Sequence, residues 1–427
     1  MNDPHQTQPL TPSPNTFPPA NISSVHEEPS PRNAETPAFS PQPLTSSAAP
    51  APSAVAPSAV APIAQGESST RIESPNVLAP SVAIAAPTTG APVMAPTVMA
   101  PSSFPSVAVS PTQVVRDLAN AVRTEVGKAV VGQDEIITQF LVALLVRGHV
   151  LLEGVPGIAK TLTAKSLAHA LSATFNRVQF TPDLMPADIV GTNVYDTRQN
   201  EFSLRRGPIF TDILLADEIN RTPPKTQAAL LEAMQERRVT IDGETHTLSP
   251  FFTVFATQNP IDYEGTYPLP EAQLDRFLLK VTMTYPSADE EAALLVRAHR
   301  GFDAHELASV GLQPVVDAAR WQQARKAVQS VTVGEGLIRY ITTIVGRTRG
   351  LPSLTLGASP RASLALLESS KALAALSGRD FVIPEDVKTV ALPVLRHRLL
   401  VRAETEMEGT RTDDIVRGVL DSVEVPR

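Results

Sequence analysis

The chain contains no cysteine and no long hydrophobic run, and both absences limit what it can be. Without cysteine it cannot form disulfides or hold a metal through thiolates. No apolar stretch approaches the roughly 20 residues that a membrane-spanning helix needs, so we expect no direct insertion into a membrane. The N-terminus also lacks the basic segment and apolar run of a secretory signal peptide. We therefore expect a soluble, cytoplasmic protein.

Positive charge is also scarce. The 36 lysine and arginine residues are outnumbered by 44 aspartate and glutamate residues, which gives a formal net charge of -8. No dense basic stripe stands out along the chain. Proteins that bind nucleic acid usually carry such a stripe, so we expect no nucleic-acid partner.

The first 110 residues have few large apolar side chains. This stretch is mostly Pro, Ala, Ser, Thr and Val, and it holds 22 of the 40 prolines. A short direct repeat, A-P-S-A-V-A-P-S-A-V-A-P, occupies residues 51–62. Such a segment cannot bury enough apolar surface to offset the entropy lost on ordering, so residues 1–110 are predicted to form a disordered Pro/Ala/Ser-rich arm.

The remainder of the chain has ordinary globular composition and is long enough for two packed domains. An apolar strand at residues 149–153, then a Gly-rich loop and a helix, begin a βαβ unit. Such units build parallel sheets covered by helices, so we expect an α/β domain over residues 111–285. Other strands are expected at residues 177–180, 213–217, 252–257 and 278–283, and helices at residues 111–126, 136–147 and 224–236.

Turn and capping signals complete this outline. Asp242-Gly243 is typical of a hairpin turn and predicts a hairpin over residues 239–248. From Ser287 the pattern becomes helical, because Ser287 to Glu290 has the spacing of a capping box and Ser359-Pro360 resembles a helix start. A smaller, all-α domain is therefore expected over residues 286–427.

A phosphate-binding loop is the clearest chemical motif. G-V-P-G-I-A-K-T follows the first strand and opens a helix, whose N-terminal N–H groups attract phosphate oxygens. Lys160 would reach the β- and γ-phosphates, and the Thr161 hydroxyl would hold Mg²⁺. Ala159 stands where the usual pattern has its second glycine, and we expect Gly157 to supply the backbone freedom instead. The residues expected to contact the nucleotide are Gly154, Val155, Pro156, Gly157, Ile158, Ala159, Lys160 and Thr161.

Two carboxylates end the apolar strand at residues 213–217. Asp217 would hold Mg²⁺, and Glu218 would polarise the attacking water. Acids exposed only at the end of a buried strand suit a ligand site at the carboxyl edge of a parallel sheet. On its own, the Asp-Glu pair also fits an ordinary solvated strand end.

Three further polar residues fit the same chemistry. Asn259 ends the next strand and could reach the attacking water or the γ-phosphate. Arg276 precedes another strand and Arg361 opens a helix of the second domain; arginine stabilises the charge of a transferring phosphoryl group. Taken singly, these residues also fit an Asn-Pro turn, a surface ion pair and a solvated helix start.

Together these motifs closely resemble the MoxR family of AAA+ ATPases. The stretches that carry the resemblance are V-V-G-Q, G-V-P-G-I-A-K-T, R-G-P-I-F, L-L-A-D-E-I-N-R, L-L-E-A-M-Q-E-R-R-V-T-I-D-G, A-T-Q-N-P-I-D-Y-E-G-T-Y-P-L-P-E-A-Q-L-D-R-F and S-P-R. They span residues 130–361 in the expected order. The resemblance implies these roles: Walker A for residues 154–161, Walker B for Asp217 and Glu218, sensor 1 for Asn259, arginine finger for Arg276 and sensor 2 for Arg361.

The resemblance also implies an architecture and an activity. The expected fold is an AAA+ P-loop NTPase domain followed by a helical lid, with Val131 and Gly132 near the adenine and a small inserted structure at residues 191–206. The expected function is Mg²⁺-dependent ATP hydrolysis by a homo-oligomeric ring, commonly a hexamer. Family members are thought to remodel client proteins, often with a partner that bears a von Willebrand factor A domain. The N-terminal arm is not part of the family pattern.

The sequence also allows two other functions. A nucleotide-gated scaffold would assemble partners without sustained turnover, but it would not need the water-activating carboxylate that Glu218 supplies. A nucleic-acid motor is disfavoured by the acidic balance and by the lack of a recognisable DNA-binding module after Arg361.

Overall fold

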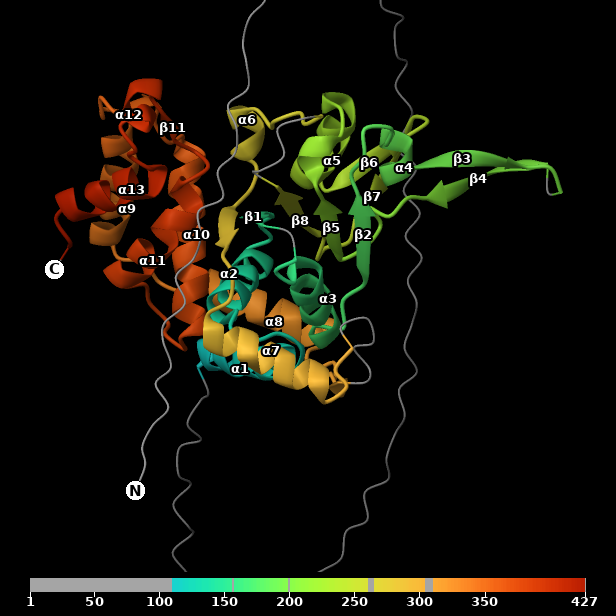
Figure 1. Cartoon of the computed structure of the whole chain (residues 1–427), viewed down its shortest axis with the longest axis horizontal. Coiled ribbons are helices and arrows are strands. Elements are labelled where there is room, and N and C mark those ends of the chain that lie inside the picture. Colours follow the sequence, from blue (N-terminus) through green and yellow to red (C-terminus); the bar gives the residue numbers. More distant parts are fainter. Residues whose placement is uncertain (1–109, 156, 199, 260–264, 304–309, 427) are drawn as a thin grey trace, which may run out of the picture. The chain divides into compact units, whose positions relative to one another are not determined.

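The computed structural model describes residues 110–155, 157–198, 200–259, 265–303 and 310–426, and most of its helices and strands are labelled in Figure 1. Apart from Ser110, the predicted disordered arm lies outside these residues. The first helix, α1 (Pro111–Ala129), begins at the expected place and runs three residues beyond residue 126. Ser110 caps it, since its hydroxyl accepts a hydrogen bond from the Thr112 N–H.

A five-stranded parallel sheet forms the centre of the folded region, as predicted. Its strand order is β2-β5-β8-β1-β9, so the first strand in the chain lies between the fourth and fifth of this sheet. The strands are β1 (Val150–Gly154), β2 (Phe175–Gln179), β5 (Ile213–Asp217), β8 (Thr253–Gln258) and β9 (Leu279–Met283). The inner strands β1, β5 and β8 are mostly apolar and buried on both faces, whereas the edge strand β2 has one buried residue.

Helices cover both faces of this sheet. On β5, the side chains of Ile213 and Leu215 join the apolar cluster that contains α1, α2 (Asp134–Leu145) and α3 (Lys160–Ala170). The alternate residues, Leu214 and Ala216, join the cluster of the opposite face. That second cluster contains α5 (Pro224–Glu236), the long helix expected from the sequence.

Two hairpins extend from the sheet domain. The predicted one is confirmed as β6 (Arg238–Ile241) and β7 (Glu244–Thr247), joined through Asp242 and Gly243 at φ 49° and 89°. The other, β3 (Gly191–Asp196) and β4 (Glu201–Arg206), follows the short helix α4 (Pro186–Val190). It projects away from the sheet in Figure 1 and is the structure expected at residues 191–206.

The C-terminal region is helical, as predicted, and also contains a short two-stranded antiparallel sheet. Its elements are α7 (Ala288–His299), α8 (Ala318–Gln329), α9 (Glu335–Thr348), β10 (Leu354–Leu356), α10 (Pro360–Leu376), α11 (Pro384–Leu395), β11 (Leu400–Val401), α12 (Ala403–Met407) and α13 (Thr412–Ser422). Two short elements precede it, η1 (Ile219–Arg221) and α6 (Glu271–Leu274). Among the described helices, none is long and apolar enough to cross a membrane.

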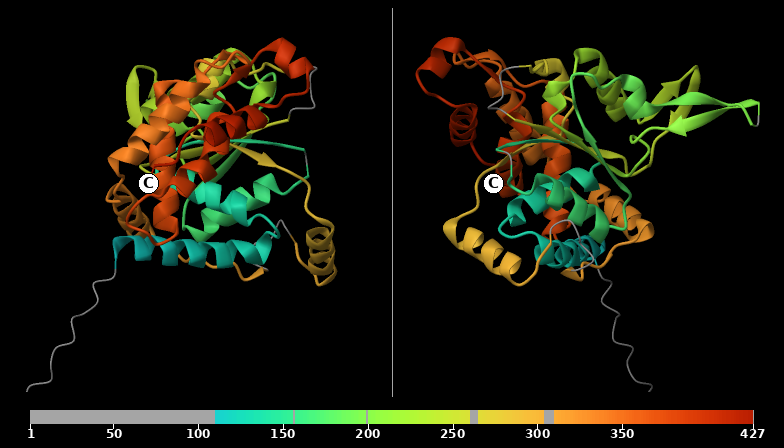
Figure 2. Two further views of the ribbon diagram at one scale, coloured as in Figure 1. Left: turned by 90° about the vertical axis from the view of Figure 1, so that its left-hand side faces the viewer. Right: turned by 45° about the vertical axis from the view of Figure 1, so that its right-hand side comes forward.

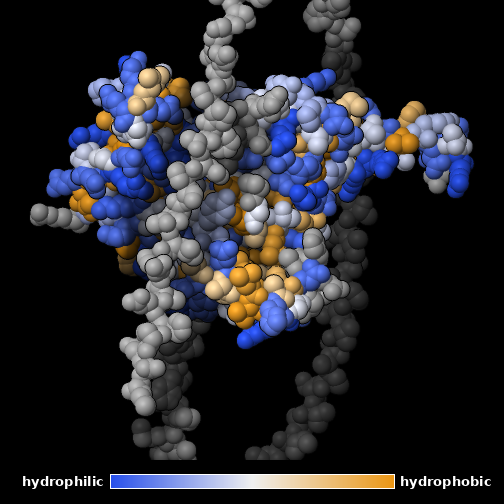
Figure 3. All heavy atoms as spheres, in the orientation of Figure 1, coloured by the Kyte–Doolittle hydropathy of each residue, from blue (hydrophilic) through white to orange (hydrophobic). Residues whose placement is uncertain are grey.

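The apolar core continues across the boundary expected at residue 285. Trp321 and Val328 of α8 are buried in the same cluster as Val115 and Val122 of α1. The helix α7 differs, because none of its residues is buried. Apolar side chains gather over it in Figure 3. Leu295 of this helix is 67% exposed. Figure 2 shows α7 in yellow-orange, set apart from the helices that cover the sheet.

Candidate functional site

The Gly-rich loop joins the end of β1 to the start of α3. Gly154 ends the strand, and a Cβ added there would lie 2.5 Å from the carbonyl oxygen of Met283, so the chain needs glycine at this point. Gly157 adopts φ 83°, and Ala159 adopts φ 64° directly before α3. Both residues therefore adopt a backbone conformation with positive φ. Glycine adopts it freely, whereas for Ala159 the left-handed conformation costs about 1 kcal/mol of conformational free energy. Pro156 lies outside the described residues.

Lys160 and Thr161 occupy the first turn of α3. The Lys160 ammonium donates a hydrogen bond to the carbonyl of Gly154, across the loop. Burial lowers the pKa of Lys160, and the nearby Asp217 and Glu218 carboxylates oppose that change. The structure therefore brings the predicted phosphate-binding lysine together with both predicted acidic residues.

The two carboxylates are held by side chains from neighbouring strands. Asp217 Oδ1 accepts a 2.6 Å hydrogen bond from Thr257 Oγ1, and Asp217 Oδ2 forms a 2.6 Å ion pair with Arg177. Glu218 Oε2 accepts a 2.6 Å hydrogen bond from Gln179 Nε2. Glu218 directly follows the strand β5. Its backbone adopts φ 57°, which is unfavourable for a residue with a side chain.

The sequence reasoning missed these three partners, Arg177, Gln179 and Thr257. Gln179 is the register partner of Asp217 in the β2–β5 pair, and Thr257 lies on β8, the other neighbour of β5. Their polarity within expected strands was a signal, but only the strand order shows which acid each one faces. The predicted Asn259 follows β8 and therefore lies at this same carboxyl edge of the sheet.

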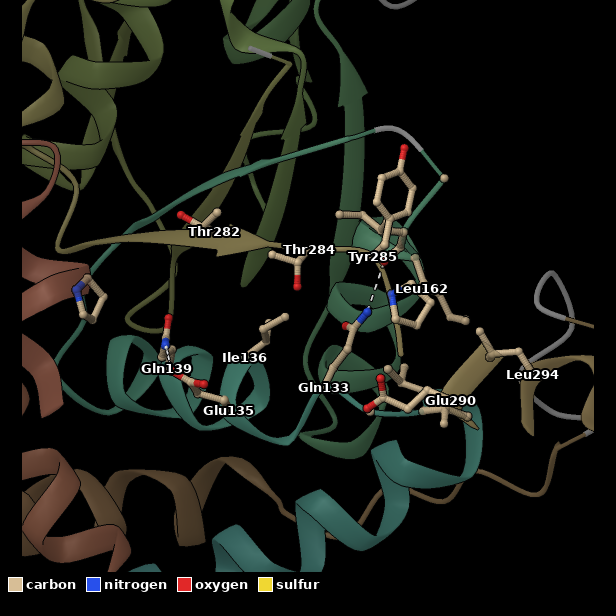
Figure 4. Close-up of a pocket in the computed structure, with 18 of the residues that line it drawn as sticks. Gln133, Glu135, Ile136, Gln139, Leu162, Thr282, Thr284, Tyr285, Glu290 and Leu294 are labelled. Carbon is tan, nitrogen blue, oxygen red and sulfur yellow. Dashed lines mark hydrogen bonds between the residues drawn. The ribbon is translucent and has the colours of Figure 1, made fainter. Parts of the chain in front are cut away.

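A cavity of about 490 Å³ adjoins the loop (Figure 4). Val131 and Gly132 line it, as expected for residues near a base. Gln133 links its two sides, because its amide donates to the Ile158 carbonyl (3.1 Å) and accepts from the Thr163 hydroxyl (2.6 Å). Further lining residues come from α2, α3, β9, the segment after β9 and the first turn of α7: Ile136, Leu162, Thr282, Thr284, Tyr285 and Glu290.

These residues fit a bound nucleoside triphosphate. The cavity offers apolar walls for a base, and the loop presents a helix N-terminus and Lys160 to an anion. Thr161 offers a hydroxyl oxygen and Asp217 offers carboxylate oxygens, and Mg²⁺ prefers oxygen ligands.

The two predicted arginines lie elsewhere. Leu278 N donates to the carbonyl of His149 (2.8 Å), so the residues before Leu278 begin at the amino end of β1, opposite the loop. Arg276 donates to the carbonyl of Leu231 on α5 (2.8 Å). Arg361 lies 3.5 Å from Asp275, and its side chain is 51% exposed. The structure therefore places Arg276 against α5 and Arg361 beside Asp275, the residue before Arg276.

A buried arginine that the sequence reasoning missed joins this second group. Arg398 donates to Asp275 Oδ1 (2.8 Å) and to the carbonyl of Leu278 (3.0 Å), and its side chain is 2% exposed. Burial lowers the pKa of Arg398 to about 10, and the pairing with Asp275 opposes that change. The ion pair connects the helical region to the segment between α6 and β9.

Comparisons with known proteins agree with this geometry. Residues 149–279 match the family described as "ATPase family associated with various cellular activities (AAA)", and residues 347–419 match the AAA lid domain. The chain is 47% identical over 301 residues to YeaC of Bacillus subtilis, covering 70% of this chain and 92% of that protein. It is 44% identical over 313 residues to the chaperone MoxR1 of Mycobacterium tuberculosis, covering 71% and 81% respectively.

Two further similarities cover most of the folded region. The chain is 31% identical over 333 residues to the protein MoxR of Methylorubrum extorquens, covering 73% of this chain and 96% of that one. A solved structure from Cytophaga hutchinsonii, of a protein assigned as an ATPase, has a TM-score of 0.69 and 41% sequence identity. That similarity covers 74% of this chain and 97% of the other.

Proposed function

The chain belongs to the MoxR family of AAA+ ATPases, and we propose that it binds ATP with Mg²⁺ and hydrolyses it. The observation that carries the proposal is the convergence of Lys160, Asp217 and Glu218 at one edge of the sheet, beside a cavity that fits a nucleoside. A binding protein without turnover would need Lys160 but not Glu218.

Each residue at this edge has a distinct role in the proposal. Lys160 and the N–H groups that open α3 bind the phosphates. Thr161 and Asp217 hold Mg²⁺, which neutralises phosphate charge when it is bound. Glu218, held by Gln179, polarises the attacking water, and Asn259 orients the same water.

We further propose that the two arginines at the opposite edge serve the nucleotide of a neighbouring copy. Within one copy, Arg276 contacts α5 and Arg361 pairs with Asp275. A homo-oligomeric ring, with the hexamer as the proposed state, would set this edge of one subunit against the loop of the next. Arginine supplied in this way stabilises charge on the transferring phosphoryl group.

The biological role in this proposal is remodelling of a client protein. The name of the 44% identical relative, chaperone MoxR1, supports it. A partner with a von Willebrand factor A domain and a cytoplasmic location complete the proposal, and pull-down and cell fractionation would test them.

Steady-state hydrolysis is the decisive test of the activity. We expect phosphate release from ATP by the wild-type protein with Mg²⁺ and none after chelation with EDTA. We expect Glu218→Gln to bind ATP normally and to hydrolyse it far more slowly. Absence of Mg²⁺-dependent turnover in an assembled wild-type protein would overturn the proposal in favour of a nucleotide-gated scaffold.

A further inference from the structure

Three arginines gather away from the nucleotide site, around the segment that leads into β8. Arg237 donates to the carbonyls of Arg147 and Phe252, the latter at 3.3 Å. Arg325 of α8 donates to the carbonyl of Pro250 (3.1 Å) and lies over the ring of Phe251, 5.9 Å from its centroid. The guanidinium groups of Arg237 and Arg325 are thus held by main-chain carbonyls of the same short segment, Pro250 to Phe252.

Among the residues that the structure describes, this cluster of positive charge has no acidic partner within ion-pair distance. Within the part of the chain that the structure describes, no carboxylate forms an ion pair with Arg147, Arg237 or Arg325. Burial lowers the pKa of Arg237 and of Arg325 to about 10, and repulsion by Arg147 contributes to both changes. Partly buried guanidinium groups that repel one another are costly unless an anion joins them.

The backbone of this cluster is also strained at two residues. Arg147 and Arg237 adopt φ 61° and 54°, a region that suits glycine and is uncommon for other residues. Arg147 follows the C-cap of α2, and Arg237 is the C-cap of α5; glycine is favoured where a helix ends in this left-handed conformation. Backbone strain kept at two charged residues of one cluster indicates that their side chains serve a purpose there.

An apolar pocket of about 230 Å³ adjoins the cluster. Phe251 and Trp321 line it, and Trp321 precedes Arg325 by one turn of α8. Its one acidic residue, Asp212, is already hydrogen-bonded by the Ser249 hydroxyl and by the N–H of Thr174. The volume lies below the roughly 300–1,000 Å³ of a drug-sized ligand site, so it suits a single bulky side chain.

We propose that Arg147, Arg237, Arg325 and this pocket form a docking site for an acidic segment of a partner polypeptide, with a carboxylate on the arginines and a neighbouring apolar side chain beside Phe251. Charge complementarity selects the anion, and the planar guanidinium groups match a carboxylate. A bare anion would use only the arginines, whereas an acidic segment with an apolar residue uses both halves of the site. The site is separate from the loop and carboxylates that bind ATP.

A peptide array tests this proposal with the full-length protein. The array carries eight-residue peptides in which Glu or Asp adjoins Leu, Met, Phe or Trp, each with its Gln or Asn counterpart. We expect retention of acidic–apolar peptides and not of their amide counterparts. Arg325→Gln should weaken retention about tenfold or more, because it removes a hydrogen bond to a charged group. Arg339→Gln, a change at an exposed arginine of α9, should leave it unchanged.

Two further variants test the arginines and the apolar pocket separately. Arg147→Gly should lower peptide retention while the melting temperature holds or rises, because glycine relieves the left-handed backbone. Ala318→Leu, at the pocket rim, should weaken retention of apolar-containing peptides alone. ATP hydrolysis should be unchanged in all of these variants, so a failure here is distinguishable from a failure of the proposed activity.

Several outcomes would overturn the proposal. One is equal retention of acidic and amide peptides by the wild-type protein, or no retention of either. Another is binding that Arg325→Gln does not change. Preference for phosphopeptides or for inorganic phosphate over the carboxylate peptides would assign a different ligand. Loss of the oligomer in Arg325→Gln would assign the surface to a second copy of this chain.

Discussion

The two ends of the sheet's central strands carry charged groups of different kinds. At the carboxyl end lie Lys160, Asp217 and Glu218, which are all partly exposed. The two carboxylates accept hydrogen bonds from side chains of adjacent strands, and Lys160 donates to the carbonyl of Gly154. At the amino end lie Arg276 and Arg361, beside a buried ion pair of Asp275 and Arg398. The five residues of β1 separate the two ends by ~17 Å. This separation supports the proposal that the two sets meet at one phosphate group only across a boundary between subunits.

The two ends also differ in the kind of unfavourable free energy that they contain. At the carboxyl end, Ala159 and Glu218 occupy left-handed backbone beside the proposed phosphates. At the amino end, the cost is desolvation of Arg398, which is offset by Asp275 and by main-chain carbonyls. Strain beside the proposed reacting groups is typical of functional sites, whereas the buried ion pair joins two parts of the fold.

The largest expected effect concerns the amino end. Arg276→Ala should slow hydrolysis by roughly 10³–10⁵-fold and leave ATP binding intact, if the arginine stabilises transferring charge on a neighbour's ATP. Glu218→Gln should be inactive for a different reason. Mixing the two inactive proteins should restore part of the activity, because some sites then pair an intact Glu218 with an intact Arg276.

A chain with both substitutions is the control and should restore nothing. Subunit exchange must be verified, for example by energy transfer between labelled copies. A mixture that exchanges and stays inactive would contradict the assignment in trans, and a fully active Arg276→Ala protein would exclude the arginine-finger role.

The next effect concerns the carboxyl end. Glu218→Gln should reduce turnover by roughly 10²–10⁴-fold with little change in ATP affinity, since it removes general-base assistance alone. Lys160→Ala should instead lose nucleotide binding, because it removes charge at the phosphates. Calorimetric titration with ATP and a phosphate-release assay separate the two outcomes. Equal loss of affinity in both variants would contradict the division of roles.

A stability measurement compares the two arginines that share Asp275. Arg398→Met should lower the free energy of unfolding by about 3 kcal/mol, because it removes the buried partner and several main-chain hydrogen bonds. Arg361→Gln should lower it by less than about 1 kcal/mol, because that pair is half-exposed. Urea unfolding measures both. Similar losses would show that burial does not distinguish the two pairs.

The smallest effect is expected at Ala159. Ala159→Gly should raise the free energy of unfolding by about 0.5–1 kcal/mol, because glycine adopts φ 64° without steric cost. Gly157→Ala, at φ 83°, is the matched reverse change and should destabilise. Thermal unfolding measures both. A loss of stability in Ala159→Gly would show that packing of the Ala159 methyl group outweighs the backbone strain.

The sequence by itself determined the local elements and the motifs that they carry. Apolar runs of strand length, a glycine-rich loop before a helix and the Asp242-Gly243 turn each depend on neighbouring residues, so β1, β5, α3 and the β6–β7 hairpin were predictable. The ends were less certain: β2 covers residues 175–179 where 177–180 was expected. Strand ends depend on pairing with neighbours, which a local pattern does not contain.

Only the tertiary structure decided which distant side chains meet. The strand order places Gln179 and Thr257 on opposite sides of β5, where they hold Glu218 and Asp217. Arg398 pairs with Asp275 across 123 positions, and no spacing rule in the sequence relates them. These contacts follow from strand pairing and from burial of two apolar faces, which are properties of the whole chain, whereas the motif residues follow from local backbone requirements.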